Sequence, residues 1–240
     1  MDEQDTKRAI AREARRILDA DGLDGLSVRA AAKAAGLSAA APYRHFAHGL
    51  PELLAWIAEE GFGELIAELE RTPVESDPRG RIVEIGLRYV GFGVQNPDLY
   101  RVLFSHRLAR PLEFYDEMFQ AGEIPHSSSQ AYAQLAAIKM TAFEALVTPI
   151  AAAQKAGVVR EGNPEDFGLA LAAMVHGLVG EFIDEGLAGR QSTDGAWSEA
   201  RREMSRRVIE FPLTGLAPVA VETGAHRRGP DKVSSGIQPG

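Results

Sequence analysis

Apolar residues recur every three or four positions along most of this chain, a spacing that places them on one side of an α-helix. The pattern predicts long helices over residues 6–20, 51–71, 78–94, 129–156, 164–187 and 198–211, and shorter ones over 97–105 and 111–119. Asp77-Pro78 and Asn163-Pro164 each pair a capping side chain with a proline suited to the first helical turn. No segment has the pattern of a strand, so we predict an all-α fold.

The segment Leu26–Phe46, LSVRAAAKAAGLSAAAPYRHF, predicts two short helices joined by a tight turn. Ser27 is placed to cap the first helix, and Gly36 lies where that helix must end. Ser38 is placed to cap the second helix, and the alanines at 39–41 give it a narrow leading face. This order is that of a helix-turn-helix motif, whose second helix enters the major groove of DNA.

The runs Ala35-Gly36-Leu37-Ser38 and Pro42-Tyr43-Arg44-His45-Phe46 resemble the DNA-binding domain of the TetR (tetracycline-repressor) family of bacterial transcription regulators. The resemblance extends over about residues 6–65. It implies a DNA-binding domain over 5–65, with a connecting helix over about 51–71, and a helical ligand-binding and dimerisation domain over 78–214. Residues 215–240 are rich in Gly, Pro and Ser without periodicity, which is typical of a disordered tail.

Hydroxyl and basic side chains surround the second helix of the motif, where they suit phosphates and base edges, and alanine methyls suit thymine methyls. The family resemblance implies a phosphate contact for Tyr43. Family members usually carry a lysine soon after His-Phe, whereas this chain has Ala47-His48-Gly49-Leu50-Pro51. The residues that we expect to contact DNA are Ser27, Arg29, Lys33, Ser38, Ala39, Ala40, Ala41, Tyr43, Arg44, His45 and His48.

The net charge of −8 is unusual for a DNA-binding protein, but it is unevenly distributed. The first 50 residues hold 8 basic and 7 acidic side chains, whereas the rest hold 18 basic and 27 acidic ones. DNA affinity depends on local positive potential, so the total charge does not exclude DNA. The chain has no cysteine, a polar N-terminus and no apolar run approaching the ~20 residues of a membrane span. We therefore expect a cytoplasmic protein without a membrane partner.

No arrangement of residues in the sequence indicates catalysis. The six histidines are scattered, and no His, Glu or Asp group has metal-ligand spacing on a helix. There is also no glycine-rich phosphate loop and no Gly-x-Ser-x-Gly motif. We expect no enzyme activity, no catalytic residue, no metal and no cofactor.

Aromatic residues and glycines of the middle helices can line an apolar cavity, although they can equally form an ordinary core. Taken with the resemblance, they predict a site for an apolar or aromatic small-molecule effector. Its candidate residues are Tyr89, Phe92, Phe104, Phe114, Tyr115, Phe119, Met140, Phe143 and Glu144, where Glu144 orients a polar ligand group or is a surface acid.

The last two long helices carry more apolar surface than a monomer needs, and in the family this pair forms a four-helix bundle with a second subunit. The candidate interface residues are Phe167, Leu171, Met174, Val175, Leu178, Phe182, Trp197, Met204 and Val208. The sequence thus favours a ligand-responsive homodimeric repressor on a palindromic double-stranded DNA operator. The alternative is a helical ligand-binding or interaction protein with a vestigial DNA-binding head.

Overall fold

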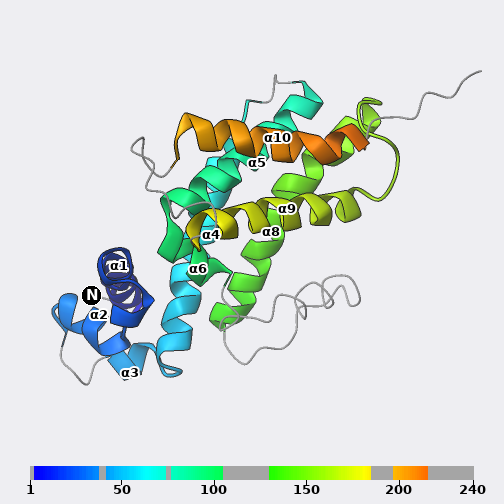
Figure 1. The fold of residues 1–240 in the computed structure, drawn as a ribbon. Helices are drawn as coiled ribbons and strands as arrows, with labels where there is room; N and C mark the ends of the chain where they lie inside the picture. Colours follow the sequence, from blue (N-terminus) through cyan, green and yellow to red (C-terminus); the bar gives the residue numbers. More distant parts are fainter. Residues whose placement is uncertain (1–2, 38–41, 74–76, 105–129, 185–196, 216–240) are drawn as a thin grey trace, which may run out of the picture.

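The structure is a computed structural model, which describes residues 3–37, 42–73, 77–104, 130–184 and 197–215. All regular secondary structure in these residues is helical (Figure 1), which confirms the predicted all-α class. The helix expected over 111–119 and the C-terminal tail lie outside the described residues.

An N-terminal head is built from α1 (Glu3–Asp21), α2 (Val28–Ala34) and α3 (Pro42–His45), with a 3-10 turn, η1 (Leu23–Gly25), after α1. The side of α1 that carries the apolar residues is buried against the other helices. Phe46 directly follows α3, is fully buried and packs edge to face on Trp56, with 6.5 Å between ring centroids. Phe46 is therefore the aromatic anchor of the head core.

The body contains α5 (Pro78–Gln95), α6 (Pro97–Leu103), α8 (Gln130–Lys155), α9 (Pro164–Ile183) and α10 (Glu199–Gly215). Two helices begin with the caps that the sequence predicts. Asp77 Oδ1 accepts a hydrogen bond from Gly80 N at 2.9 Å, and Asn163 Oδ1 accepts one from Glu165 N at 3.0 Å. The helix α4 (Leu50–Glu70) begins in the head and runs into the body beside α8 (Figure 1). It is the connecting helix that the sequence predicts.

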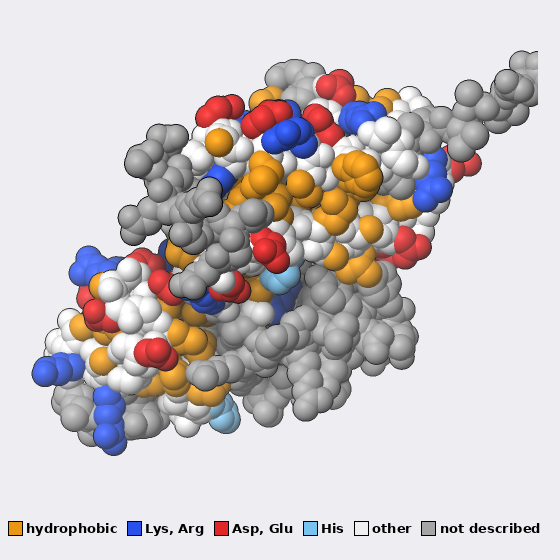
Figure 2. All heavy atoms as spheres, viewed as in Figure 1, with side chains coloured by type: hydrophobic (Ala, Val, Ile, Leu, Met, Phe, Trp, Pro, Cys, Tyr) orange, Lys and Arg blue, Asp and Glu red, His pale blue; other side chains and the backbone are white. Residues whose placement is uncertain are grey.

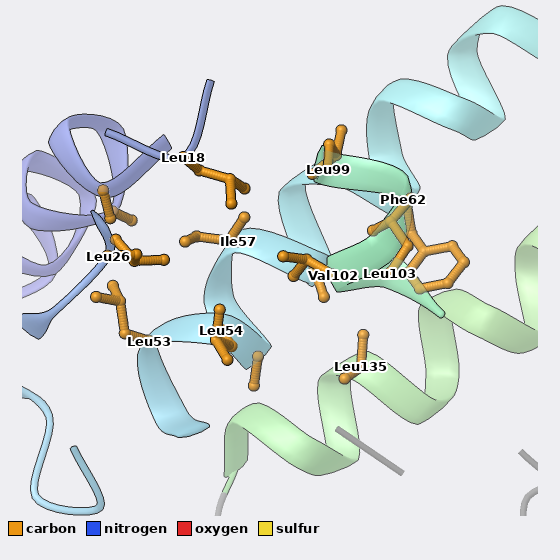
Figure 3. Close-up of a cluster of buried hydrophobic side chains, with 14 of the residues drawn as sticks. Leu18, Leu26, Leu53, Leu54, Ile57, Phe62, Leu99, Val102, Leu103 and Leu135 are labelled. Carbon is orange, nitrogen blue, oxygen red and sulfur yellow. The ribbon is translucent and has the colours of Figure 1, made fainter. Parts of the chain in front are cut away.

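One apolar cluster continues from the head into the body (Figure 3). Leu18 and Leu26 of the head meet Leu53 and Ile57 of α4, and the cluster then passes to α6 and to Leu135 of α8. These side chains are almost fully buried. The head therefore rests on the body through a shared core along α4 rather than on an exposed linker.

The last helix is longer than the sequence predicts: α10 continues through Pro212 and ends at Gly215. A proline removes one helical hydrogen bond, which normally favours termination. Here Leu213 is 2% exposed and belongs to the same buried cluster as Ile209, so packing holds the extra turn.

The residues Gln134–Lys155 and Pro164–Ile183 form helices that are long and apolar enough to cross a membrane, by length and composition alone. This corrects the expectation that no apolar segment approaches the length of a membrane span. The expectation arose because scattered polar residues such as Lys139 and Glu144 divide the apolar sequence into shorter runs. Core helices of soluble proteins pass the same test, so the evidence is weak.

In Figure 2, hydrophobic side chains gather on the face where α9 and α10 lie.

Candidate nucleic-acid interface and internal cavity

The first helix of the helix-turn-helix motif begins and ends where its sequence predicts. Ser27 Oγ accepts a hydrogen bond from Ala30 N at 3.1 Å, and Gly36 has a φ of 75°, a value that favours glycine. Leu37 N then donates to Ala32 O at 2.9 Å, which satisfies a carbonyl of the last turn. These bonds fix the length of α2 and the direction of the chain that leaves it.

Basic side chains are exposed on the head where the sequence places its DNA contacts. Arg29 and Lys33 of α2, Arg44 of α3 and His48 of the following turn are all exposed. Ser27 is exposed as well, although its hydroxyl already caps α2. This group supplies the cationic donors that bind phosphate oxygens in protein–DNA complexes.

The remaining predicted contacts of the head differ in how far the structure describes them. His45 is half-buried, and its Nδ1 is enclosed without a hydrogen-bond partner among the described residues. Tyr43 belongs to α3, but its side chain lies outside the described set. Ser38, Ala39, Ala40 and Ala41 lie wholly outside it.

The basic residues of α1 are largely engaged with acids of the protein. Arg15 lies 2.9 Å from Asp19 and 3.3 Å from Glu64 of α4, and Arg16 lies 3.2 Å from Glu13. These pairs favour a structural role for Arg15 and Arg16.

The turn before α4 is fixed by a buried acid of the helix itself. Glu52 is buried, and its Oε2 accepts a hydrogen bond from His48 N at 3.1 Å. Gly49 has a φ of 69°, so the chain reverses sharply into the helix. This holds the exposed His48 side chain at the base of the head.

Helices of the body, together with α4, line an apolar cavity of about 110 Å³ that is partly open to solvent. Among the sequence-predicted ligand residues, Tyr89, Phe104 and Phe143 line it. The other lining residues are Phe62, Leu65 and Leu69 of α4, Ile82, Ile85 and Gly86 of α5, Leu103 of α6, Lys139, Ala142 and Leu146 of α8, Leu171, Ala172 and Val175 of α9, and Ile209 of α10.

Several predicted ligand residues lie elsewhere. Glu144 is exposed, because successive residues on a helix point about 100° apart and Phe143 takes the inward direction. Met140 is half-buried but does not line the cavity, and Phe92 lines a separate polar groove next to α10. Phe114, Tyr115 and Phe119 lie outside the described residues.

Lys139 lines the cavity and is absent from the sequence-predicted set. Its Nζ lies 5.6 Å from the centroid of the Phe62 ring, within the range of a cation–π interaction. Burial lowers the pKa of Lys139 to about 8, because an ammonium in apolar surroundings loses hydration. A signal existed in the sequence: Lys139 lies four residues after Leu135 and seven before Leu146, on the apolar arc of α8.

A hydrogen-bonded cluster lies behind the cavity wall. The Tyr100 hydroxyl contacts His176 Nδ1 at 2.5 Å and the Tyr89 hydroxyl at 3.1 Å. The His176 ring packs on Tyr100 and Phe104 with one edge still exposed, and this partial burial lowers its pKa. The cluster joins α5, α6 and α9.

A shallow apolar groove runs over the outer face of α9 and α10. It is lined by Met174, Met204, Val208, Phe211 and the side chain of Arg207. Phe211 is 81% exposed and shares the groove with three other apolar side chains, and contiguous exposed apolar patches mark interaction sites. The groove is therefore the surface that most resembles a subunit interface.

Four of the other six residues predicted for the interface are buried within the single chain. Leu171, Val175, Leu178 and Phe182 are between 2% and 8% exposed, so they belong to the core of the single chain. Trp197 packs on Gly91 of α5, where its Nε1 would lie 2.8 Å from an added Cβ. Phe167 is half-buried beneath Arg160. Because α9 is apolar over a wide arc, its sequence cannot distinguish a core face from an interface.

Among the described residues, no group of three or more His, Cys, Asp and Glu side chains is placed to hold a metal ion. No family model matches the sequence, and no curated protein matches it either.

Solved structures do match. A Rhodococcus sp. RHA1 protein of unknown function is 26% identical, with a TM-score of 0.66, over 89% of this chain and 96% of its own. The TetR-family regulator PfmR from Thermus thermophilus is 20% identical, with a TM-score of 0.56, over 87% and 99%. AibR, in complex with isovaleryl coenzyme A and operator DNA, is 18% identical, with a TM-score of 0.53, over 89% and 98%.

Proposed function

We propose that this chain, which has the fold of the TetR-family transcriptional regulators, is a ligand-responsive repressor that binds a palindromic operator as a homodimer. It would act in the cytoplasm without catalytic chemistry. The observation that carries the proposal is the course of α4. Leu53 and Ile57 of this helix belong to the head core, whereas Phe62 and Leu65 of the same helix line the cavity.

The exposed cations of the head support DNA binding. Arg29, Lys33, Arg44 and His48 would contact phosphates, and the helix that ends in α3 would enter the major groove. The other residues predicted to contact DNA stay candidates for the same surface; they are Ser27, Ser38, Ala39, Ala40, Ala41, Tyr43 and His45. AibR, whose structure holds both an acyl coenzyme A and operator DNA, is a precedent for both kinds of ligand on this fold.

Pairing through the groove on α9 and α10 supports binding to two half-sites. Self-complementary association around a two-fold axis would cover Phe211, Met204 and Val208 of both copies. Two heads would then read half-sites about 34 Å apart, one turn of DNA. This doubling compensates for the few contacts that one small head can make.

Ligand control would be a shift between two conformations. A ligand that binds better to one arrangement of the cavity favours the corresponding position of α4. Because α4 carries the head, the two recognition helices would no longer match successive major grooves. The ligand would thus release the operator without touching the DNA-binding surface.

Selection of bound sequences from a random DNA pool at physiological salt tests this function. We expect a palindromic motif with half-site centres about ten base pairs apart. Affinity for it should fall about 10³-fold between 50 and 200 mM salt if about six phosphates are contacted. A folded dimer that enriches no sequence would contradict the proposal and favour a ligand-binding or interaction protein with a vestigial head.

A further inference from the structure

We infer that the volume occupied inside the cavity controls how strongly two copies of this chain associate, because α10 lies between the cavity and the groove on α9 and α10. A ligand in the cavity would weaken the pairing of the two subunits. This inference rests on the proposed function and deepens it, since it adds subunit association to what the effector regulates. It is carried by neighbouring residues that face opposite sides of one helix.

The two faces of α10 are lined by adjacent residues. Ile209 is 1% exposed and lines the cavity, whereas Val208 and Phe211 line the groove. Successive residues of a helix point about 100° apart, so one turn of α10 reaches both spaces. The wall between the cavity and the groove is therefore a single helix thick at this point.

The same arrangement occurs on α9. Val175 is buried and lines the cavity, and Met174, the residue before it, lines the groove. Both helices of the groove thus have an inner face on the cavity. A change in the space inside the body reaches the groove through either helix without crossing another layer.

Ile209 approaches α5 closely. Gly86 of α5 also lines the cavity, and a Cβ atom added to it would lie 2.9 Å from Ile209 Cδ1. Protein interiors are close-packed, so a group that takes up space beside Ile209 must displace this side chain or the helix that carries it. The displacement is directed away from the cavity and toward the groove.

Contacts near both ends of α10 confine such a displacement to the segment between them. Arg202 Nη2 lies 3.0 Å from Glu84 Oε2 of α5, and Thr214 Oγ1 accepts a hydrogen bond from Arg79 Nη2 of α5 at 3.3 Å. The residues of α10 that line the groove all lie between these two contacts. A movement of Ile209 would therefore appear at the groove.

The groove suits a second copy of the same chain by its charges as well as by its apolar residues. Arg207 lies in the groove, and its Nε is 4.0 Å from Glu203 Oε1, one turn earlier. A face with both signs side by side can meet its own copy about a two-fold axis without gathering like charges. Well-packed apolar contacts tolerate little displacement, so movement of α10 would weaken the pairing.

The effector is unidentified, so the probe is a methyl group added to the cavity wall of the full-length protein. Gly86→Ala places a Cβ atom against Ile209, and we expect it to raise the dimer dissociation constant about 10-fold, a usual size for coupling between two sites. Sedimentation equilibrium measures this constant. Gly63→Ala on α4 is the matched control, because among the described residues its added Cβ would meet only Ile138 Cδ1, at 4.0 Å.

Two further variants distinguish transmission through the groove helices from a general disturbance of the fold. Ile209→Val removes Cδ1, the atom nearest to the added methyl, so Gly86→Ala combined with Ile209→Val should regain most of the dimer affinity. Ala172→Leu adds volume to the same wall from α9 and should weaken association as Gly86→Ala does. Thermal unfolding verifies that each variant is folded.

The inference is overturned by any of three results. Folded Gly86→Ala and Ala172→Leu could associate as tightly as the unaltered protein. Gly63→Ala could weaken association as much as Gly86→Ala does. Adding Ile209→Val to Gly86→Ala could restore no affinity.

The DNA selection described above separates this inference from the proposed function. A dimer that Gly86→Ala weakens but that enriches no DNA sequence would support the link between cavity and groove and contradict the regulator. A sequence-specific dimer whose association ignores Gly86→Ala would contradict this inference alone. A monomeric unaltered protein would overturn both.

Discussion

Arg88 Nη1 on α5 lies 2.8 Å from Glu68 Oε1 on the connecting helix α4. Arg88 Nε lies 3.4 Å from Glu84, and Glu84 in turn lies 3.0 Å from Arg202 of α10. A row of partly buried ion pairs thus joins the helix that carries the head to the helix that lines the candidate subunit groove. A change of position in α4 must either move its neighbours or break the Arg88–Glu68 pair.

The Arg88–Glu68 pair should contribute more to stability than an exposed pair does. A double-mutant cycle with Arg88→Met and Glu68→Gln, measured by urea unfolding, should give a coupling energy of about 1 kcal/mol. The control cycle is Arg16→Met with Glu13→Gln, an i,i+3 pair whose arginine side chain is 71% exposed. It should give about 0.3 kcal/mol. Equal coupling energies in the two cycles would contradict this prediction.

Removal of a head cation should weaken operator binding and leave the fold intact. Arg29→Ala should lower affinity for the selected operator by about 10-fold or more, because Arg29 is an exposed cation on α2. Tyr43→Ala should act in the same direction. Arg16→Ala is the control, because it removes an exposed cation from α1, outside the helix-turn-helix motif. Gel-shift titrations measure these affinities, and sedimentation verifies that each variant keeps its oligomeric state.

A lysine at position 48 should strengthen DNA binding. His48 is exposed just before α4, close to where the family usually has a phosphate-binding lysine. His48→Lys adds a lasting positive charge, and one added phosphate contact raises the salt dependence of log affinity by about one. Binding titrations over a range of salt concentrations measure this slope. An unchanged slope would mean that the side chain at position 48 does not reach a phosphate.

The groove on α9 and α10 should hold two subunits together. Phe211→Asp places a charge where an 81% exposed aromatic side chain now lies, which should shift a dimer toward monomer. Phe211→Leu keeps the position apolar and serves as the control. Sedimentation equilibrium measures the shift, and an unchanged dimer in Phe211→Asp would place the interface elsewhere.

Local features of the fold follow from the sequence because they depend on near neighbours. The caps at Ser27, Asp77 and Asn163 and the turn at Gly36 each need only a few adjacent residues. The aromatic positions Tyr89, Phe104 and Phe143 were also identifiable as cavity candidates. Which of the candidates meet around one space depends on helix packing, and residue types alone do not specify it.

Lys139 illustrates this limit. In an alanine-rich helix a lysine usually indicates the solvent side, and only its place on the arc of Leu135 and Leu146 indicates otherwise. The residues of α9 that the sequence predicts for the subunit interface show the same limit, because the same apolar pattern also fits a core. Leu171 and Val175 are as apolar as any subunit contact, yet the packing of α5 covers them within one chain.

The connecting helix α4 also works as a lever. Its 21 residues form a rod about 30 Å long, with the cavity near one end and the head at the other. A tilt of about 5° at the cavity end would displace the far end by nearly 3 Å, by the geometry of such a rod. That displacement is comparable to the length of a hydrogen bond, so in the proposed regulator a small change of packing around the cavity would be enough to misalign the contacts with DNA.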